Sequence, residues 1–414
     1  MTDHQQVSIF DADQLAACVQ CGFCLSSCPT YETTYLEEHG PRGRILAMRL
    51  VEEGELAIDD PDVVDSLETC VQCRACEVVC PSLVEFGSLM ETARAAIEEQ
   101  RPPAGVEARG QQVLFAALRH RWLLRLGTTL LALAQTLRLD RVLPSRLRPA
   151  RRVRLGDTLR GYRLPPPGAP AQGDAFLFRG CVMDGMFRDV HRATAQVLAA
   201  VGHRPRFEPA PPCCGALSAH AGREQEAHAL AEATIAAYAG TEGPILVNSA
   251  GCGGAMKEYG ALLGTDEARA FSERVTDLSE LISPEEVAAR GAALQLTLAY
   301  QAPCHLKNVQ GLADQARALI AAIPGLRLLE PDDEQQCCGS GGIYSYLQPA
   351  FGDALLARKH GALQRTGAQG VVSGNPGCAM QIAREGWEVH HPAQLLARSL
   401  TSEVSDQVSD PSPA

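Results

Sequence analysis

Two short cysteine runs decide the fold: CVQCGFCLSSCP at residues 18–29 and CVQCRACEVVCP at residues 70–81. Both have the spacing Cys-x2-Cys-x2-Cys-x3-Cys-Pro. Three thiols two residues apart in a tight loop can point at three corners of one small inorganic core. Small residues such as Gly22 and Ala75 let backbone N–H groups approach the sulfurs. The two runs therefore predict a pair of matched metal-binding loops.

This spacing is the signature of [4Fe–4S] ligation, in which the fourth cysteine of each run binds the other cluster. We therefore expect two [4Fe–4S] clusters with crossed ligands. Zinc or disulfides would leave the third cysteine of each run unused, so we disfavour both. The expected ligands are Cys18, Cys21, Cys24 and Cys80 for the first cluster, and Cys70, Cys73, Cys76 and Cys28 for the second.

The residues between the two runs show helical patterns. Pro61 follows two aspartates and suits a first helical position, and residues 45–53 form an amphipathic run after Pro41-Arg42-Gly43-Arg44. We expect an all-α two-cluster ferredoxin module over residues 1–100. Arg42 and Arg44 have two open interpretations: cations near a cluster that raise its potential, or helix-start chemistry with solvated charge.

The chain repeats itself beyond residue 170. AFLFRGC, PPCCGA and PILVNSAGC, which begin at residues 175, 211 and 244, reappear as LAYQAPC, QQCCGS and GVVSGNPGC from residues 298, 335 and 370. Corresponding cysteines are offset by 123, 124 and 126 residues. A shared period indicates duplicated units, and strands that alternate with helices indicate α/β structure. We expect a first Cys-Cys-Gly half at residues 171–290 and a second at 291–400.

These halves hold the other eight cysteines at predicted strand ends or in glycine-rich loops. Such thiols suit ligand binding or redox work, including a third iron–sulfur cluster, but buried structural thiols and disulfides stay open. His305, Lys257 and Glu258 lie beside these cysteines and could handle protons, although solvated groups are the simpler interpretation. The eight are Cys181, Cys213, Cys214, Cys252, Cys304, Cys337, Cys338 and Cys378.

The composition excludes several classes of protein. The net charge of −12 argues against a nucleic-acid binder. The N-terminal residues lack the pattern of a secretory signal, and no stretch is long and apolar enough to span a membrane. No dinucleotide fingerprint or phosphate-binding P-loop occurs. The chain is therefore expected to pass electrons, while two-electron chemistry takes place on another protein.

An arginine-rich connector is expected over residues 101–170. Residues 101–163 hold 14 Arg, no Lys and three acidic residues, and a proline cluster follows at 164–170. One interpretation is a solvated helical connector whose arginines pair with acidic residues elsewhere. The other is a surface helix that turns Trp122, Leu123, Leu126, Leu130 and Leu133 toward a partner or anionic lipid. Residues 401–414 are predicted to be a disordered tail.

The motifs together resemble the iron–sulfur subunits of flavin-linked dehydrogenases, in particular the glycolate oxidase (glycolate dehydrogenase) iron–sulfur subunit family. GPRGRI from residue 40, SAGCGGAMKEYG from 249, CCGSGGIYS from 337 and NPGC from 375 carry the resemblance. It implies a complex with FAD-binding subunits that oxidises glycolate to glyoxylate, with D-lactate as a secondary substrate. Electrons would cross the clusters to a membrane quinone. The complex would lie peripherally at the cytoplasmic face of the inner membrane.

Other functions use the same modules. The chain also resembles iron–sulfur subunits of D-lactate or anaerobic glycerol-3-phosphate dehydrogenases. It is similar as well to the catalytic subunit of heterodisulfide reductase, a thiol–disulfide enzyme whose Cys-Cys-Gly domains end in Cys-x-x-Cys. Here that last cysteine is absent, because Cys252 precedes Gly-Gly-Ala and Cys378 precedes Ala-Met-Gln. A redox-sensing or structural metal protein is a further alternative.

Overall fold

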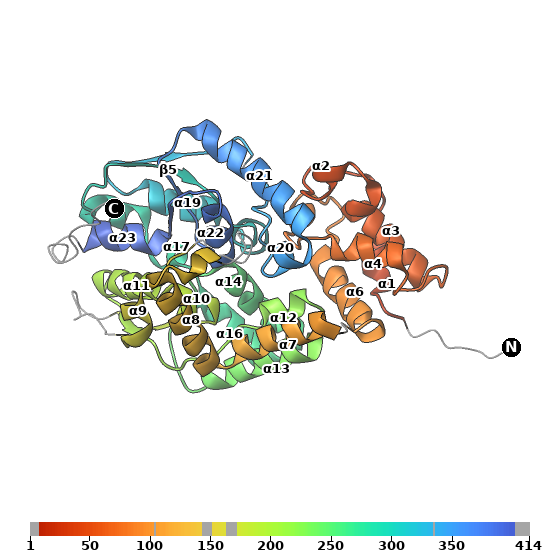
Figure 1. Ribbon diagram of the computed structural model, residues 1–414, viewed down its shortest axis with the longest axis horizontal. Helices are drawn as coiled ribbons and strands as arrows, with labels where there is room; N and C mark the ends of the chain where they lie inside the picture. The colour runs from red at the N-terminus through yellow and green to blue at the C-terminus, as the bar shows by residue number, and fades with distance from the viewer. Residues whose placement is uncertain (1–7, 103–104, 143–150, 163–171, 334–335, 402–414) are drawn as a thin grey trace. The chain divides into compact units, whose positions relative to one another are not determined.

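The computed structural model describes residues 8–102, 105–142, 151–162, 172–333 and 336–401 (Figure 1). The chain forms two compact units. The first, the ferredoxin unit, comprises Met1–Phe115, Gly215–Leu230 and Gln335–Gly361. The second, the sheet unit, comprises Ala116–Cys214, Ala231–Glu334 and Ala362–Ala414. Each is described by itself below.

The front of the ferredoxin unit is built from short helices. Pro41 and Pro61 open α3 and α4, and Asp11 and Asp60 cap α1 and α4 with their carboxylates. The predicted helix start at Pro61 is confirmed, whereas α3 already begins at Pro41, four residues before the expected run. The helices are α1 (Ala12–Ala17), α2 (Tyr31–Thr34), η1 (Glu37–His39), α3 (Pro41–Glu52), α4 (Pro61–Glu68), α5 (Ala75–Val78) and α6 (Phe86–Gln100).

A small apolar core holds these helices together. Met48 of α3, Leu67 of α4, and Met90 and Ala93 of α6 are fully buried. The unit is completed by α12 (Ala216–His220) and α20 (Tyr344–Leu347), and it shares α7 (Gly105–Arg119), α13 (Glu224–Ala237) and α21 (Pro349–Thr366) with the sheet unit. Segments far apart in the chain therefore contribute to the ferredoxin unit.

The sheet unit contains two parallel four-stranded sheets with the orders β2-β1-β3-β4 and β6-β5-β7-β8. The same order in both sheets confirms the duplicated α/β halves that the cysteine offsets predict. The strands are β1 (Asp174–Leu177), β2 (Arg204–Arg206), β3 (Ile245–Leu246), β4 (Val275–Thr276), β5 (Leu296–Tyr300), β6 (Leu326–Leu329), β7 (Gly370–Val372) and β8 (Val389–His390).

Helices connect these strands, as parallel pairing requires. In the first half they are α10 (Val182–Met186), α11 (Arg188–Ala200), α14 (Ala250–Lys257), α15 (Tyr259–Leu263), α16 (Asp266–Arg274), α17 (Leu278–Leu281) and α18 (Pro284–Arg290). In the second half they are η4 (His305–Val309), α19 (Ala313–Ala321), α22 (Pro376–Ala383) and α23 (Pro392–Leu400).

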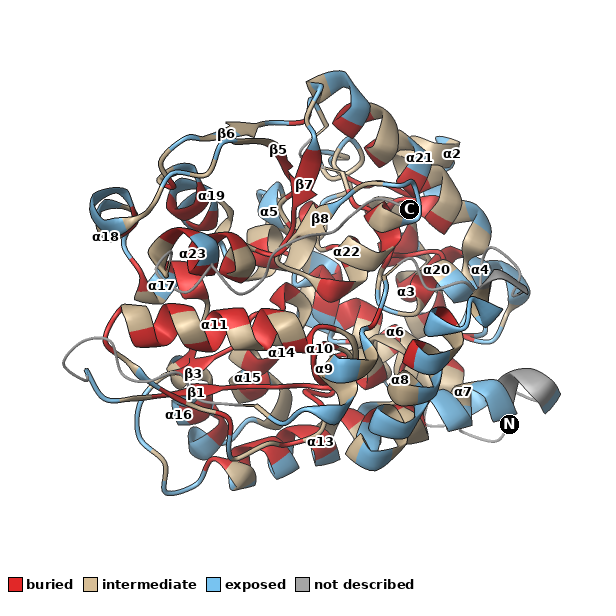
Figure 2. Ribbon diagram, turned by 60° about the vertical axis from the view of Figure 1, so that its left-hand side comes forward, coloured by how far each residue is buried: buried red, intermediate tan, exposed pale blue. Residues whose placement is uncertain are grey.

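The two halves share one apolar core. Leu177, Leu198 and Leu246 of the first half belong to the same buried cluster as Val372 and Leu395 of the second. Helix α11 packs against α23, and most of its residues are buried (Figure 2). Since the halves bury a common set of side chains, neither sheet folds around a core of its own.

The connector is largely helical and is bound to the first half by ion pairs. It contributes α8 (Arg121–Thr136), η2 (Leu139–Val142) and α9 (Leu155–Leu159). An Arg121 Nη donates to Asp184 at 2.7 Å, and Arg151 donates to both carboxylate oxygens of Asp189 at 2.6 Å. The predicted pairing of connector arginines with acidic residues is thus confirmed for these two. The predicted proline joint at residues 164–170 and all but the first residue of the predicted tail at 401–414 lie outside the described residues.

Asp184 is the centre of this ionic cluster. Its buried carboxylate accepts hydrogen bonds from Arg121, Arg179 and Arg188 and, at 2.6 Å, from the hydroxyl of Tyr162. Burial alone would raise the pKa of Asp184, but these hydrogen bonds and the charges of Arg121 and Arg188 outweigh it and lower that pKa. The carboxylate therefore stays ionised inside the protein.

None of the helices in the described parts of the chain combines the length and the apolarity needed to cross a bilayer.

Replacing Asp184 with Asn should lower the free energy of unfolding by about 3–5 kcal/mol, because it leaves buried arginines without their counter-charge. Denaturant midpoints measured by circular dichroism check this. Asp266→Asn removes the partner of Arg269 in a solvent-exposed pair and serves as the control, with no measurable change expected. Equal midpoints for both variants would contradict a stabilising role for the cluster.

Candidate metal centre

The two cysteine runs fold into loops of matching backbone geometry. Gln20 and Gly22 of the first loop have positive φ angles of 58° and 82°, and Gln72 and Arg74 occupy the same places in the second with 53° and 57°. Such left-handed conformations are costly for residues other than glycine, and they turn successive thiols toward one side. All sixteen cysteines of the chain lie in described segments, and none forms a disulfide. The disulfide alternative is therefore wrong in this structure.

The fourth cysteine of the first run lies with the first three cysteines of the second run. Cys28, Cys70, Cys73 and Cys76 are all buried. Burial is the main cause that raises the pKa of Cys73, and repulsion from Cys337, Cys28 and Cys70 adds to it. The pKa of Cys76 is raised by burial and then by Cys73, Cys70 and Cys28. Thiolates gathered in this way need a compensating positive charge, which the irons of a cluster supply.

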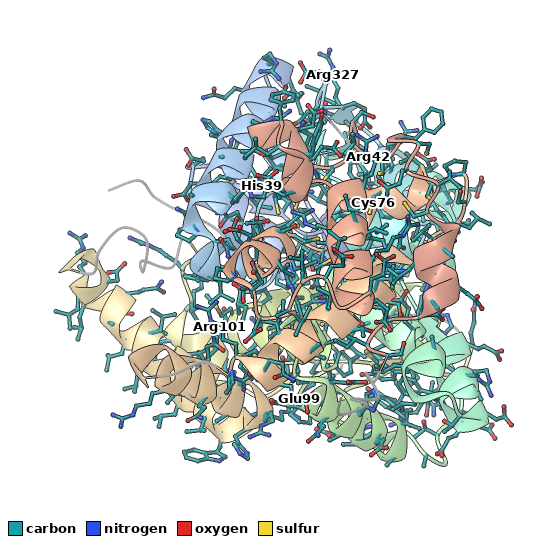
Figure 3. All side chains as sticks on the ribbon, turned by 90° about the vertical axis from the view of Figure 1, so that its right-hand side faces the viewer. His39, Arg42, Cys76, Glu99, Arg101 and Arg327 are labelled. Atoms are coloured by element: carbon teal, nitrogen blue, oxygen red, sulfur yellow. The ribbon has the colours of Figure 1, made fainter. Side chains whose placement is uncertain are left out.

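The remaining four thiols border a second space in the same unit. Cys18, Cys21, Cys24 and Cys80 line one cavity, together with Cys76 and the side chain of Arg42. Burial, opposed by backbone hydrogen bonds, raises the pKa of Cys24 to about 11. Figure 3 shows the side chains of this unit with Arg42 and Cys76 labelled. The structure thus brings Cys80 to the first loop and Cys28 to the second.

No three His, Cys, Asp or Glu side chains of the described residues converge on the position of a single metal ion. A [4Fe–4S] cube presents four irons at separate corners, so its thiolates stand farther apart than the ligands of one ion.

Two arginines of α3 reach the cysteine loops. Arg44 is fully buried, and its Nη1 lies 3.9 Å from the sulfur of Cys28. Arg42 donates to the carbonyl oxygen of Gln20 at 3.1 Å and pairs with Glu37. Both therefore lie beside predicted ligands, and the interpretation of Arg44 as a solvated charge is wrong. That they raise a cluster potential stays a prediction.

Steric crowding explains why glycine occupies residues 40 and 43 of the GPRGRI motif. A Cβ at residue 43 would overlap the carbonyl oxygen of Glu37, and one at residue 40 would lie 2.8 Å from the side chain of Leu25. Only glycine lets η1 and the first turn of α3 approach so closely. This contact holds Arg42 and Arg44 against the loops.

The Cys337-Cys338 loop belongs to the ferredoxin unit. Cys337 lies close enough to Cys73 to raise its pKa, after burial. The hydroxyl of Tyr344 donates to the backbone carbonyl of Thr69 at 2.8 Å, directly before Cys70. Sequence reasoning assigned this loop only to the second α/β half. No local signal in the sequence reveals its contact with the second cysteine run.

In the first half, four cysteines gather in the sheet unit. The sulfurs of Cys181 and Cys213 lie 3.8 Å apart, and Cys214 hydrogen-bonds through its side chain to Cys252. The adjacent residues Cys213 and Cys214 therefore contact different cysteines from elsewhere in the chain, Cys181 and Cys252 respectively. Their backbone is fixed by Tyr259, whose hydroxyl donates to the carbonyl of Cys214 at 2.7 Å. The four thiols form one compact, largely buried group.

The loops that follow β3 and β7 meet at the carboxyl ends of the two sheets, where parallel α/β folds place ligands. The Asn375 carboxamide accepts from the backbone N–H of Gly251 at 3.2 Å and lies 3.4 Å from the sulfur of Cys378. Lys257 pairs with Glu280 at 2.8 Å, which agrees with a partly solvated structural role. Asn375 was missed in the sequence because amides have no characteristic spacing.

Comparison with known proteins agrees with this division of the cysteines into two kinds of domain. A model of the 4Fe-4S dicluster domain covers residues 14–84, and a model of the cysteine-rich domain covers residues 175–257 and 298–383. The probable glycolate oxidase iron–sulfur subunit of Bacillus subtilis is 35% identical over 404 residues, which are 91% of each chain. The chain belongs to the glycolate oxidase iron–sulfur subunit family. The resemblance drawn from the motifs is confirmed.

Other relatives agree with this family. The glycolate oxidase iron–sulfur subunit of Escherichia coli is 30% identical over 96% of this chain and 98% of its own length. Lactate utilization protein A of Oceanobacillus iheyensis is 29% identical over 53% of this chain and 95% of its own length. As a member of the glycolate oxidase iron–sulfur subunit family, the chain carries iron–sulfur clusters of the dicluster type and works with partner subunits.

Proposed function

We propose that the chain is the iron–sulfur electron-transfer subunit of a flavin-dependent glycolate dehydrogenase complex. FAD-binding partner subunits oxidise glycolate to glyoxylate, and the two electrons leave one at a time toward a quinone. The complex lies peripherally at the cytoplasmic face of the inner membrane. The observation that carries this proposal is the convergence of Cys28 on the second cysteine loop, in a chain similar over nearly its whole length to glycolate oxidase iron–sulfur subunits.

The front of the chain acts as an all-α two-cluster ferredoxin module in this proposal. Cys18, Cys21, Cys24 and Cys80 hold one cluster, and Cys70, Cys73, Cys76 and Cys28 hold the other. The clusters supply one-electron oxidation and reduction. The chain binds them with eight thiolates and fixes their spacing, because each cysteine run contributes to both. Arg44 adds a buried positive charge beside Cys28, which favours the reduced, more negative state.

Electrons enter through an apolar rim around the first cysteine loop. This rim consists of exposed residues that border Cys18, Cys21 and Cys80 in sequence: Val19, Phe23, Val78, Val79 and Leu83. Val19 and Phe23 also line the cavity shared by the cysteines. Exposed apolar side chains gathered at one site mark protein interfaces, so the rim suits a flavoprotein. The second loop lies against Cys337 instead, which gives electrons an exit through the ferredoxin unit.

A third cluster in the sheet unit is a second element of the proposal. The sulfurs of Cys181 and Cys213 lie 3.8 Å apart, so the thiols of this half are gathered closely enough for a small cluster, on which each would bind a different iron. Cys214 is held beside Cys252 in the same group. The missing final cysteine of the heterodisulfide reductase pattern disfavours disulfide reduction as the function.

The lactate relatives support the second substrate. Lactate utilization protein A shares about half of this chain, so D-lactate is the alternative 2-hydroxyacid. Glycolate is preferred because the relatives named for it match over 91% and 96% of this chain.

Anaerobic addition of glycolate should bleach the visible absorption of this chain only when its flavoprotein partner is present. The chain itself has no predicted site for hydride transfer, so it cannot oxidise glycolate alone. Stopped-flow absorption of the purified chain, of the complex, and of the complex with D-lactate compares the three cases. Bleaching of the isolated chain by glycolate, or none in the complex, would defeat the proposed role.

Cys28→Ser should perturb mainly the cluster held by Cys70, Cys73 and Cys76, although Cys28 belongs to the first run. Cys80→Ser is the matched reciprocal variant and should perturb mainly the cluster held by Cys18, Cys21 and Cys24. EPR spectra of the reduced variants separate the two signals. If each variant damages the cluster of its own run, the crossed assignment is wrong.

Iron analysis should find more than eight irons per chain if the sheet unit binds a cluster. The double variant Cys181→Ser/Cys213→Ser should then lose that extra iron while both ferredoxin signals stay unchanged in EPR. The reason is that its two thiols lie in the sheet unit, apart from the eight ferredoxin ligands. Eight irons in the wild-type chain and in the variant would rule out a third cluster.

A further inference from the structure

Helix α8 exposes large apolar side chains to solvent, whereas a surface helix of a water-soluble protein normally buries them against the core. Two of its polar side chains face the protein: Arg121 pairs with Asp184, and Gln135 is buried, with its amide bonded to the backbone of Arg151 and Val153. Thr128 lies against Gly185 on the same side. These polar contacts, together with the buried Ala132, attach the helix to the rest of the sheet unit.

The opposite face of α8 is apolar and exposed. Trp122, Leu126, Leu130 and Leu133 recur at helical spacing, and Leu137 continues the series at the C-cap. Their exposed fractions are 64%, 51%, 57%, 43% and 59%. Figure 2 shows the exposed positions along α8 in pale blue. At 1.5 Å per residue this face is about 22 Å long. Water alone does not stabilise such a face, so it requires an apolar occupant.

The charges around this face are positive. No acidic residue occurs from residue 121 to 139, while Arg125 and Arg138 are exposed and form no ion pair with another described residue. The arginine excess of residues 101–163 stands out in a chain whose net charge is −12. The occupant must therefore be apolar in its interior and negatively charged at its surface.

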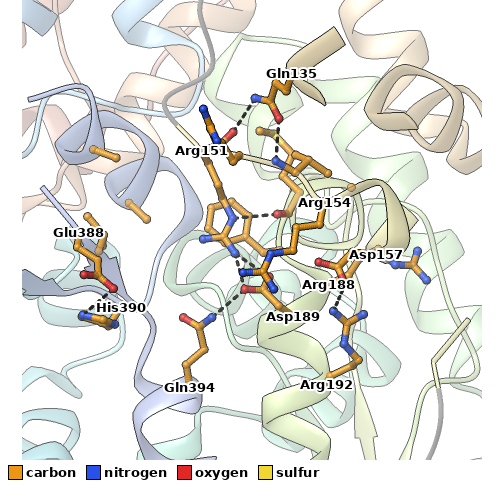
Figure 4. A pocket seen from close by; sticks show the side chains of 18 of the residues that line it. Gln135, Arg151, Arg154, Asp157, Arg188, Asp189, Arg192, Glu388, His390 and Gln394 are labelled. Atoms are coloured by element: carbon orange, nitrogen blue, oxygen red, sulfur yellow. Dashed lines mark hydrogen bonds and ion pairs between the residues drawn. The ribbon is translucent and has the colours of Figure 1, made fainter. Parts of the chain in front are cut away.

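An arginine-lined cavity of about 950 Å³ opens where α8 ends (Figure 4). Arg151, Arg188 and Arg192 are paired there with Asp189, Asp184 and Asp157. Three more arginines of the lining are exposed and have no ion pair within the described residues: Arg138, Arg152 and Arg154. Guanidinium groups free of counter-charges suit phosphate oxygens, because their planar N–H groups bind them bidentately.

We propose that α8 is a membrane-docking helix that lies in the interface of an anionic phospholipid bilayer. The five apolar side chains insert between acyl chains, Trp122 lies at the headgroup level, and the unpaired arginines bind lipid phosphates. This inference rests on the peripheral membrane position in the proposed function and assigns it to named residues. It corresponds to the second interpretation of the connector, in which a surface helix turns its apolar face toward anionic lipid.

Vesicle flotation of the cluster-loaded full chain tests the proposal. The chain should float with vesicles of phosphatidylglycerol and phosphatidylcholine, and bind pure phosphatidylcholine far more weakly. Leu126→Glu/Leu130→Glu should weaken binding at least about tenfold, since it places charges in the inserted face. Arg125→Gln/Arg138→Gln should weaken binding to the anionic vesicles by about 30-fold and remove most of its salt dependence.

Ala261→Glu/Ala270→Glu is the matched control, because it adds the same charge at exposed helical positions of the sheet unit. It should float like the wild type. Unchanged visible absorption and thermal midpoint show that each variant is folded. A wild-type chain that does not float, or a leucine variant that floats normally, overturns the proposal. So does a leucine variant that keeps vesicle binding but loses the flavoprotein, since the face then binds protein.

Bleaching of the complex by glycolate in vesicle-free solution is measured in parallel. The leucine variant should bleach at the wild-type rate there. Normal flotation without any bleaching would refute the proposed electron-transfer role and leave the docking helix intact. Normal bleaching without flotation would refute the docking helix and leave the proposed electron-transfer role intact.

Discussion

Burial of thiols beside one another is the constraint on which the ferredoxin unit depends. Cys28, Cys70, Cys73 and Cys76 are withdrawn from water, and both burial and mutual repulsion oppose their ionisation. A metal ligand must nevertheless be a thiolate. The unit places a buried arginine, Arg44, 3.9 Å from the sulfur of Cys28, and left-handed backbone turns shape both cysteine loops. The tight packing of η1 against α3, which requires glycine at residue 43, keeps that arginine in place.

A second buried charge organises the sheet unit. Asp184 collects arginines from the connector, from the end of β1 and from α11, and so joins three segments of the sequence at one carboxylate. Because Arg121 and Gln135 of α8 are bound on the side that faces the protein, Leu126, Leu130 and Leu133 lie on the opposite, exposed side. The polarity of α8 is thus a direct consequence of where its ion pair lies.

Much of this could be predicted from the sequence, because the determining signals are local. The spacing of cysteines fixed the expectation of two clusters, and the offsets between Cys181 and Cys304 or Cys213 and Cys337 revealed two equivalent sheets before any strand was placed. Pro61 also predicts a helix start from the local sequence, because proline suits the first position of a helix. Contacts between distant segments were not accessible in this way. Nothing near Tyr344 or Cys337 shows that this loop packs beside Cys70 and Cys73, and no pattern identifies Asn375 as one of the residues that link the two halves.

The common core of the two halves has a consequence for their packing. A single half, with α11 or α23 but not both, would leave an apolar helix face and sheet face uncovered, and the simplest cover is a second copy of itself. The two halves therefore pack against each other as the subunits of a symmetric dimer would. The halves nevertheless differ at their Cys-Cys-Gly motifs, because Cys213 and Cys214 belong to the sheet unit, whereas Cys337 and Cys338 belong to the ferredoxin unit.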